Sequence, residues 1–303
     1  MNTAAALSAL VLAASLGLAA RAPVAFKMIN VFSEAPLPAF EVRDSIDIAK
    51  IVRAIPDRGA AGTADAVYAA HPGERYERSV VQGFGNCSNL VKGLSWGLLR
   101  DGHEFEIVYV LPPASYLEGG GHTILRARLA LPEGPRVGLV DVAAAAVPRS
   151  AGQVLDVGDL HHVTTAAYLD QVRPESEDWA PFYTAEFLRG TVIGRTSSAE
   201  TAHWFRFVEA IYVDLGVPEK FDKIIYAGIG VALGASPPIH VDAHDLELMR
   251  AQHPYRFAQM SAALWGLRVA PLVLLGCGLS WLVQGLRRRS GTVECRDFAG
   301  AGS

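Results

Sequence analysis

Three residues of the types used in thiol catalysis follow one another along this chain. They are Cys87, His122 and Asp141. Acyl transfer through a thiol requires a thiolate as the nucleophile and a group that protonates the leaving group, and one histidine commonly serves both needs. An acidic side chain then fixes the tautomer and orientation of that histidine. We therefore interpret these three residues as a candidate catalytic set.

The helix expected over Asn86–Arg100 places Cys87 at its first turn. Apolar residues recur there at steps of three and four, which is typical of a helix that packs one face inward. These residues are Leu90, Val91, Leu94 and Leu98. Cys87 shares this face. Amide groups and the partial positive charge at a helix N-terminus stabilise a thiolate and can hold the oxyanion of a tetrahedral intermediate. The position therefore favours a reactive thiol.

The other two residues are expected on neighbouring strands. Aromatic and β-branched residues predict strands, and these are expected over 103–111, 122–129 and 138–142. The turn at 131–135 lies midway between His122 and Asp141, so an antiparallel hairpin brings them within a few residues of direct cross-strand partners. The run Gly119-Gly120-Gly121 lacks side chains and leaves the imidazole of His122 reachable from a cleft.

Two charge-free apolar runs point to the cell envelope. Ala4–Ala20 has the length of a signal-peptide core, and an uncleaved anchor is the alternative because no Lys or Arg precedes it. Val269–Leu286 is long enough to cross the hydrocarbon layer, with a buried core helix as the alternative. The positive-inside rule places the following Arg287-Arg288-Arg289 in the cytoplasm. We expect a single C-terminal span in the cell membrane, a periplasmic main domain and a cytoplasmic C-terminus.

The cysteine positions make Cys87 unusual in that compartment. The chain has three cysteines, of which Cys277 lies inside the expected span and Cys295 lies in the tail. Cys87 is then alone in the exported region. A single thiol in an oxidising compartment is a liability unless it is buried or chemically useful.

The chain divides into five expected parts. These are a signal peptide or anchor over 1–22, a core over 23–170, a helical extension over 171–262, a transmembrane helix over 263–286 and a cytoplasmic tail over 287–303. Within the extension, Ser197 and Glu200 have the spacing of a capping box at a helix start. The expected fold class is α+β, with the helix that carries Cys87 packed on an antiparallel sheet.

The net charge argues against nucleic-acid binding, and one local pattern argues against a metal site. The formal net charge is -4, from 27 basic and 31 acidic side chains, so no broad basic field exists to bind nucleic acid. The run His240–Asp245 contains potential metal ligands, but Asp242 is better interpreted as the cap of a following helix. We expect no metal at this run.

The motifs around these residues resemble the core of the transglutaminase-like superfamily, whose members have a papain-like fold. The resemblance is carried by Gly85-Asn86-Cys87, the helix end Leu98-Leu99-Arg100-Asp101-Gly102, the strand Phe105–Tyr109, and then His122 and Asp141. It implies thiol chemistry on amide bonds, either hydrolysis or transamidation, without a metal or organic cofactor. The stretch Asn86–Val91 also resembles the "DCSGLV" of cell-wall amidases of the NlpC/P60 type, but the spacing from cysteine to histidine favours the first family.

The resemblance covers residues 80–148 and implies a membrane-tethered cysteine peptidase, amidase or acyl transferase that acts on a protein or peptide. By analogy with papain-like enzymes, Gln82 is a candidate oxyanion donor. Two departures from the family pattern are Thr123 directly after His122 and Val142 directly after Asp141. They keep open a second interpretation, in which the domain is an inactive scaffold that binds an envelope protein or polymer.

Overall fold

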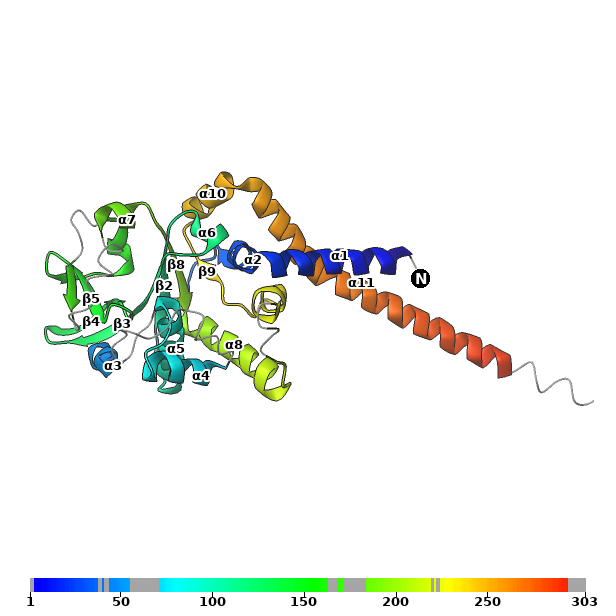
Figure 1. Ribbon diagram of the computed structural model, residues 1–303, viewed down its shortest axis with the longest axis horizontal. Coiled ribbons are helices and arrows are strands. Elements are labelled where there is room, and N and C mark those ends of the chain that lie inside the picture. The colour runs from blue at the N-terminus through cyan, green and yellow to red at the C-terminus, as the bar shows by residue number, and fades with distance from the viewer. Residues whose placement is uncertain are drawn as a thin grey trace, which may run out of the picture.

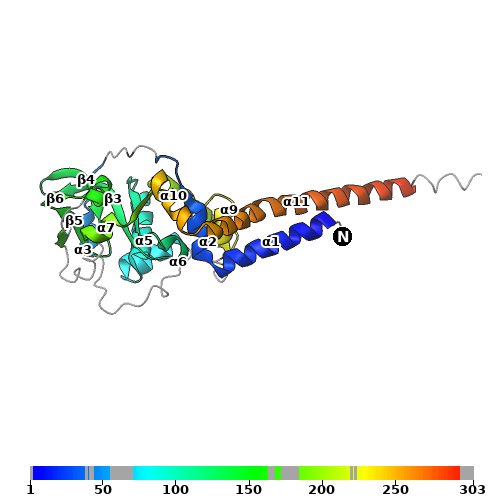
Figure 2. The same cartoon turned by 90° about the horizontal axis from the view of Figure 1, so that it is seen from above.

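The computed structural model describes residues 3–37, 40, 44–54, 71–162, 168–171, 184–218, 221 and 224–293. In this part of the chain the architecture is mixed α+β: a domain built on a six-stranded sheet, from which two long helices project side by side (Figures 1 and 2). The expected α+β class is confirmed as a mixed arrangement of helices and strands.

The main sheet has the order β1-β9-β8-β2-β3-β4. Its strands are β1 (Phe32–Ser33), β2 (Glu106–Leu111), β3 (His122–Leu131), β4 (Gly134–Val140), β8 (Val192–Ser197) and β9 (Ile239–His240). Neighbours pair antiparallel except β1 and β9. A second sheet, β6-β5-β7, consists of β5 (Ala146–Ser150), β6 (Gln153–Val154) and β7 (Tyr168–Gln171).

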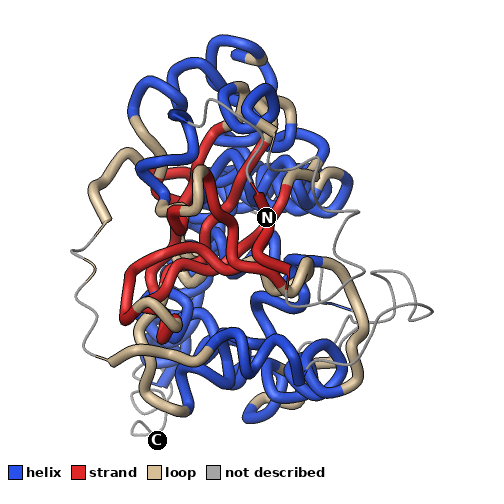
Figure 3. The backbone as a smooth tube through the Cα atoms, turned by 90° about the vertical axis from the view of Figure 1, so that its left-hand side faces the viewer, coloured by secondary structure: helices blue, strands red, loops and turns tan. Residues whose placement is uncertain are grey.

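Helices lie on both sides of the strands (Figure 3). The α-helices are α1 (Thr3–Arg21), α2 (Pro23–Val31), α3 (Ile48–Ala54), α4 (Pro72–Tyr76), α5 (Cys87–Arg100), α6 (Ser115–Glu118), α7 (Ala185–Arg189), α8 (Ser198–Glu209), α9 (Gly230–Ala232), α10 (Ala243–Gln252) and α11 (Pro254–Val293). Short irregular helical turns are η2 (Glu77–Val81), η3 (Val157–His162), η5 (Ala210–Asp214) and η7 (Ile224–Ile229).

Alternation along β2 and β3 gives each face of the sheet its own core. Ile107 and Leu125 face α5 and pack with its apolar stripe of Leu90, Val91, Leu94 and Leu98. Val108 and Ile124 face the other way and pack with Leu160 of η3. The four α5 side chains are at most 2% exposed, and burial of each contributes roughly 1.5–3 kcal/mol. This packing fixes α5, and with it Cys87, against the sheet.

The expected helical extension over 171–262 is corrected by the structure. Its strand β8 pairs along its whole length with β2, from Glu106↔Ser197 to Leu111↔Val192, and so lies inside the main sheet. The alternate residues Val192, Gly194 and Thr196 are buried, which is the period of a strand. The boundary expected at 170 therefore does not separate a core from an appended unit.

The N-terminal run that the sequence predicts as a signal peptide or anchor is a second candidate membrane span. Two helices, α1 and the Pro254–Arg287 part of α11, are long and apolar enough to cross a bilayer. They pack against each other where Ser15 and Ala19 of α1 are buried, with Ala19 in one apolar cluster with Ala263 and Leu267 of α11. Farther along α11 the side chains are exposed, including Leu272 at 68% and Trp281 at 77%. The expected tail lies beyond the described residues from position 294 onward.

Candidate active site

The first turn of α5 presents Cys87. Asn86 is the N-cap of this helix, and its side-chain oxygen accepts a hydrogen bond from the Asn89 amide at 3.1 Å. This cap fixes where the helix begins, so Cys87 is the first helical residue and lies among amides that have no partner within the helix. The side chain is 8% exposed and is not part of a disulfide.

The first residue of β3 is His122, which pairs with Val110 of β2. The chain enters this strand through Gly121, whose φ of +86° is in the left-handed region. A Cβ at Gly121 would lie 2.5 Å from the carbonyl oxygen of Val110, so only glycine fits here without a shift. The tight entry fixes the imidazole at the first residue of β3.

A short turn after β4 holds Asp141. Asp141 and Ala146 form an antiparallel bridge, with their backbone amides and carbonyls bonded to each other at 2.9 and 3.0 Å. The Oδ1 atom of Asp141 accepts a hydrogen bond from the Ala144 amide at 2.9 Å. Since Leu125 pairs with Val140, the same register places Asp141 opposite Ile124, two positions from His122. The hairpin thus makes them diagonal neighbours on one face.

The three residues expected from the sequence meet in the structure. The Nε2 atom of His122 lies 2.5 Å from Oδ2 of Asp141, and the two side chains are 1% and 0% exposed. The His122 imidazole also interacts electrostatically with the thiol of Cys87. The backbone amide of Thr123 donates a further hydrogen bond to the sulfur.

This arrangement lowers the pKa of Cys87 and raises the pKa of His122, so each side chain favours its charged form. Burial alone raises the pKa of the Cys87 thiol, but the hydrogen bond and positive charge of His122 outweigh burial and lower that pKa below its ordinary value. Burial lowers the pKa of His122, while the Asp141 carboxylate beside it and the bonds to Asp141 and Cys87 raise it to about 10. The lowered pKa of the thiol and the raised pKa of the imidazole both favour the charged forms more than in the free side chains.

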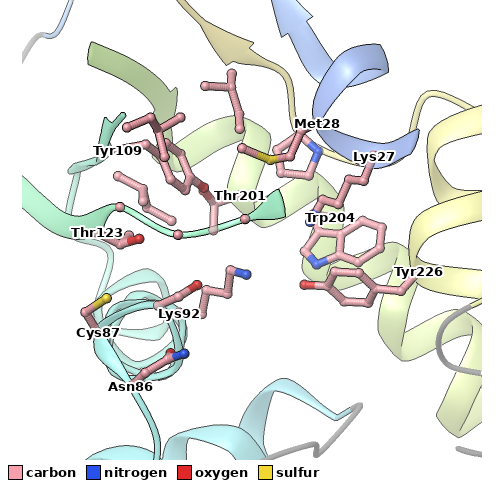
Figure 4. Close-up of a pocket in the computed structure, with 18 of the residues that line it drawn as sticks. Lys27, Met28, Asn86, Cys87, Lys92, Tyr109, Thr123, Thr201, Trp204 and Tyr226 are labelled. Carbon is pink, nitrogen blue, oxygen red and sulfur yellow. The ribbon is translucent and has the colours of Figure 1, made fainter. Parts of the chain in front are cut away.

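A cavity of about 240 Å³ opens beside the sulfur (Figure 4). Its walls come from segments far apart in sequence: α2, α5, the start of β3, α8 and η7. Residues that line it include Lys27, Lys92, Tyr109, Trp204 and Tyr226, together with the Gly119–Gly121 run. The glycine run lines the cavity, but His122 is not among its lining residues and is 1% exposed, so the expectation that this run leaves the imidazole reachable from a cleft is wrong. A substrate that enters this cavity reaches the thiol directly.

The structure does not bring Gln82 to this cavity. Gln82 ends η2, is exposed, and its side-chain amide donates to the carboxylate of Glu77 at 3.3 Å. It is absent from the residues that line the space beside Cys87. Cys87 itself is the first residue of α5, beside the free amides of that helix start.

His240 serves a structural purpose in this fold. Its Nε2 lies 2.7 Å from Oε1 of Glu200 and its Nδ1 lies 2.7 Å from the carbonyl oxygen of Ala35. Glu200 also closes the capping box of α8 with Ser197, as its spacing predicted. Asp242 is the N-cap of α10 by position, although its side chain makes no capping hydrogen bond. These contacts tie β9 and α8 together at the sheet edge.

Comparison of the chain with protein-family models, curated proteins and solved structures finds no match.

Sequence reasoning missed the cationic and aromatic part of the cavity. Lys27 comes from α2 and Tyr226 from η7, and neither shares a motif or a periodic pattern with Cys87. Lys92 lies five positions after Cys87 on α5. Its sequence position alone indicates only a lysine on the solvated side of a helix. Only the pairing of β8 and β9 with the rest of the sheet brings these segments together.

Proposed function

We propose that this protein is a membrane-tethered thiol enzyme of the transglutaminase-like, papain-fold type that hydrolyses or transamidates an amide substrate. The observation that carries this proposal is the position of the His122 imidazole between the Cys87 thiol and the Asp141 carboxylate. A buried acid, a base and a nucleophile in that order form the arrangement required for acyl transfer.

In the first half of the reaction, the Cys87 thiolate attacks the carbonyl carbon of the substrate. A carbon–sulfur bond forms and the carbonyl electron pair moves to oxygen, where amides at the start of α5 stabilise the charge. When that pair returns, the carbon–nitrogen bond breaks. The leaving amine takes the proton of the His122 imidazolium. The products of this half are a thioester on Cys87 and a free amine.

In the second half, water or an acceptor amine attacks the thioester. His122 takes a proton from the attacking group, the carbon–sulfur bond breaks, and the thiolate is restored beside an imidazolium. Asp141 keeps the imidazole in one orientation throughout the cycle. Access of water or an amine to the cavity decides between hydrolysis and transamidation.

We also propose that α1 and α11 span the membrane together and place the domain outside the cytoplasm. The apolar, exposed side chains along both helices support lipid contact, since such surface is costly in water. The Arg287-Arg288-Arg289 cluster favours a cytoplasmic C-terminus. Because α1 lies beside α11, with the start of α1 and the end of α11 both pointing away from the domain (Figure 1), the start of α1 would lie on that same side.

The proposal is tested by acylation of the purified full chain in detergent with 4-nitrophenyl acetate. The expected result is a burst of nitrophenolate close to one equivalent per chain, with an acetyl group found on the Cys87 peptide by mass spectrometry. Cys87→Ser should remove both signals, and Cys277→Ser is the matched control that should keep them. Absence of a burst and of the acetyl adduct in the parent would favour the scaffold interpretation.

A further inference from the structure

The far end of the cavity from Cys87 is cationic and aromatic. Figure 4 shows the side chains of Lys27, Lys92 and Tyr226 gathered there, with Trp204 beside them. The Nζ atoms of Lys27 and Lys92 lie 4.6 and 6.0 Å from the centre of the Tyr226 ring. The Arg75 guanidinium lies 5.9 Å from the same centre. Three cations thus surround one aromatic ring.

No carboxylate lines this cavity among the residues that the structure describes. The nearby acid Glu200 is bound to Ser197 at one oxygen and to His240 at the other. Burial raises the pKa of Tyr226, but the charges of Lys92, Lys27 and Arg75 outweigh it and lower that pKa to about 6. Even with the phenol ionised, three cations against one phenolate leave this end positive at neutral pH.

The walls here also offer apolar contact. The rings of Trp204 and Tyr226 meet edge to face with centres 4.4 Å apart, and Trp204 is 4% exposed. Such a pair is held rigid by its packing. The cavity therefore combines an apolar wall with fixed positive charge, and both lie within one continuous space that reaches the sulfur.

We propose that this cationic end binds a carboxylate on the acyl group of the substrate, with Lys27 and Lys92 as its partners. The inference rests on the proposed function, because it assigns the specificity of the same thiol. It narrows the substrate class to amides whose acyl portion carries a negative charge within reach of Cys87, as an acidic peptide does. Lysine side chains bind such a group through charge and hydrogen bonds.

A pair of reagents that differ only in charge tests this assignment. Iodoacetate carries a carboxylate and iodoacetamide is its neutral analogue, and both alkylate the same sulfur. The rates at which each modifies Cys87 are measured on the full chain in detergent by peptide mass spectrometry, and their ratio is divided by the ratio for glutathione. The variants are Lys27→Met and Lys92→Met, with exposed Lys50→Met as the matched control.

The expected result is a normalised ratio above one in the parent and in Lys50→Met. Each cavity variant should lower it by about threefold, the change given by one unit charge acting over roughly 6 Å in water. Added salt should lower the parent ratio. Equal ratios in the parent and both cavity variants, with rapid iodoacetamide reaction, would overturn the carboxylate assignment and leave the proposed function standing. If neither reagent modifies Cys87 in the folded chain, the carboxylate assignment and the proposed function are both contradicted.

Discussion

The imidazole of His122 and the carboxylate of Asp141 are joined by a 2.5 Å contact that is closed to solvent. His122 begins β3 and Asp141 directly follows β4, so the contact depends on the register of these two strands. The second carboxylate oxygen is held by the amide of Ala144. Asp141 therefore has one orientation, and it imposes one orientation on the imidazole.

Asp141→Asn tests this orientation with little change in shape. The asparagine oxygen can still accept from the Ala144 amide, but the NH₂ group then faces Nε2 of His122 and makes that nitrogen an acceptor. The ring proton moves to Nδ1 and the charge that stabilises the imidazolium is lost. We expect acylation of Cys87 to slow by about a hundredfold, measured by the nitrophenolate burst. An unchanged rate would show that Asp141 does not act on the imidazole.

The two glycines before His122 separate a steric effect from a backbone effect. Gly120 and Gly121 both have positive φ, at +109° and +86°, but a Cβ meets the Val110 oxygen only at Gly121. Gly121→Ala should therefore lower the free energy of unfolding by about 2 kcal/mol more than Gly120→Ala. Urea unfolding of the two variants measures the difference. Equal losses in the free energy of unfolding would mean that the backbone at Gly121 shifts to accommodate a Cβ at no energetic cost.

The ion pairs behind the site provide a test of stability. Arg126 binds Asp156 through two nitrogens, at 2.6 and 2.7 Å, and Glu106 through a third at 3.0 Å. Glu106 is 2% exposed, and its other cation, on Arg195, lies 3.8 Å away. Arg126→Met leaves the buried Glu106 carboxylate with only the more distant Arg195 to balance its charge. The free energy of unfolding should therefore fall by about 3 kcal/mol.

Arg149→Met is the control for that measurement. Arg149 pairs with Glu133 at 2.7 Å on the surface, where solvent screens the charges. Its loss should have a small effect on the same urea unfolding curve. If the two variants lose equal stability, Glu106 is not held by Arg126 in the way the contacts indicate.

Part of this architecture follows from local sequence pattern. The apolar spacing of 90–98 predicts α5 to within a residue, and the turn at 131–135 predicts the hairpin that brings His122 near Asp141. Both signals are short in range. Insertion of β8 between β2 and β9 has no such signal, because its pairing partners lie far away in sequence. Gln82 failed as an oxyanion donor because η2 ends with its side chain directed to Glu77.

The packing of α1 on α11 predicts a specific cross-link. A Cβ at Gly266 would lie 3.2 Å from the Cβ of Ser15, close to the ~3.8 Å typical of a disulfide. Ser15→Cys/Gly266→Cys should therefore form a disulfide within one chain when membranes are treated with a mild oxidant. Mass spectrometry of the linked peptides detects it.

Gly17→Cys/Gly266→Cys is the matched control, because a Cβ at Gly17 has no neighbour within 4 Å. It should remain reduced. If the first pair also stays reduced and the mature chain lacks 1–20 by intact mass, the N-terminal run is a cleaved signal peptide and α11 is the sole anchor of the two.

The most direct test of the account is the pH dependence of Cys87 alkylation by iodoacetamide, measured peptide by peptide on the full chain in detergent. The parent should show an apparent thiol pKa clearly below the ordinary value of about 8.5, because His122 and the Thr123 amide favour the thiolate. Reactivity should rise as pH passes this pKa, before His122 loses its own proton near its pKa of about 10. His122→Asn should return the thiol pKa to its ordinary range or above. A thiol that reacts only after unfolding, or one whose pKa is the same in parent and variant, would contradict the assignment of Cys87 as an activated nucleophile.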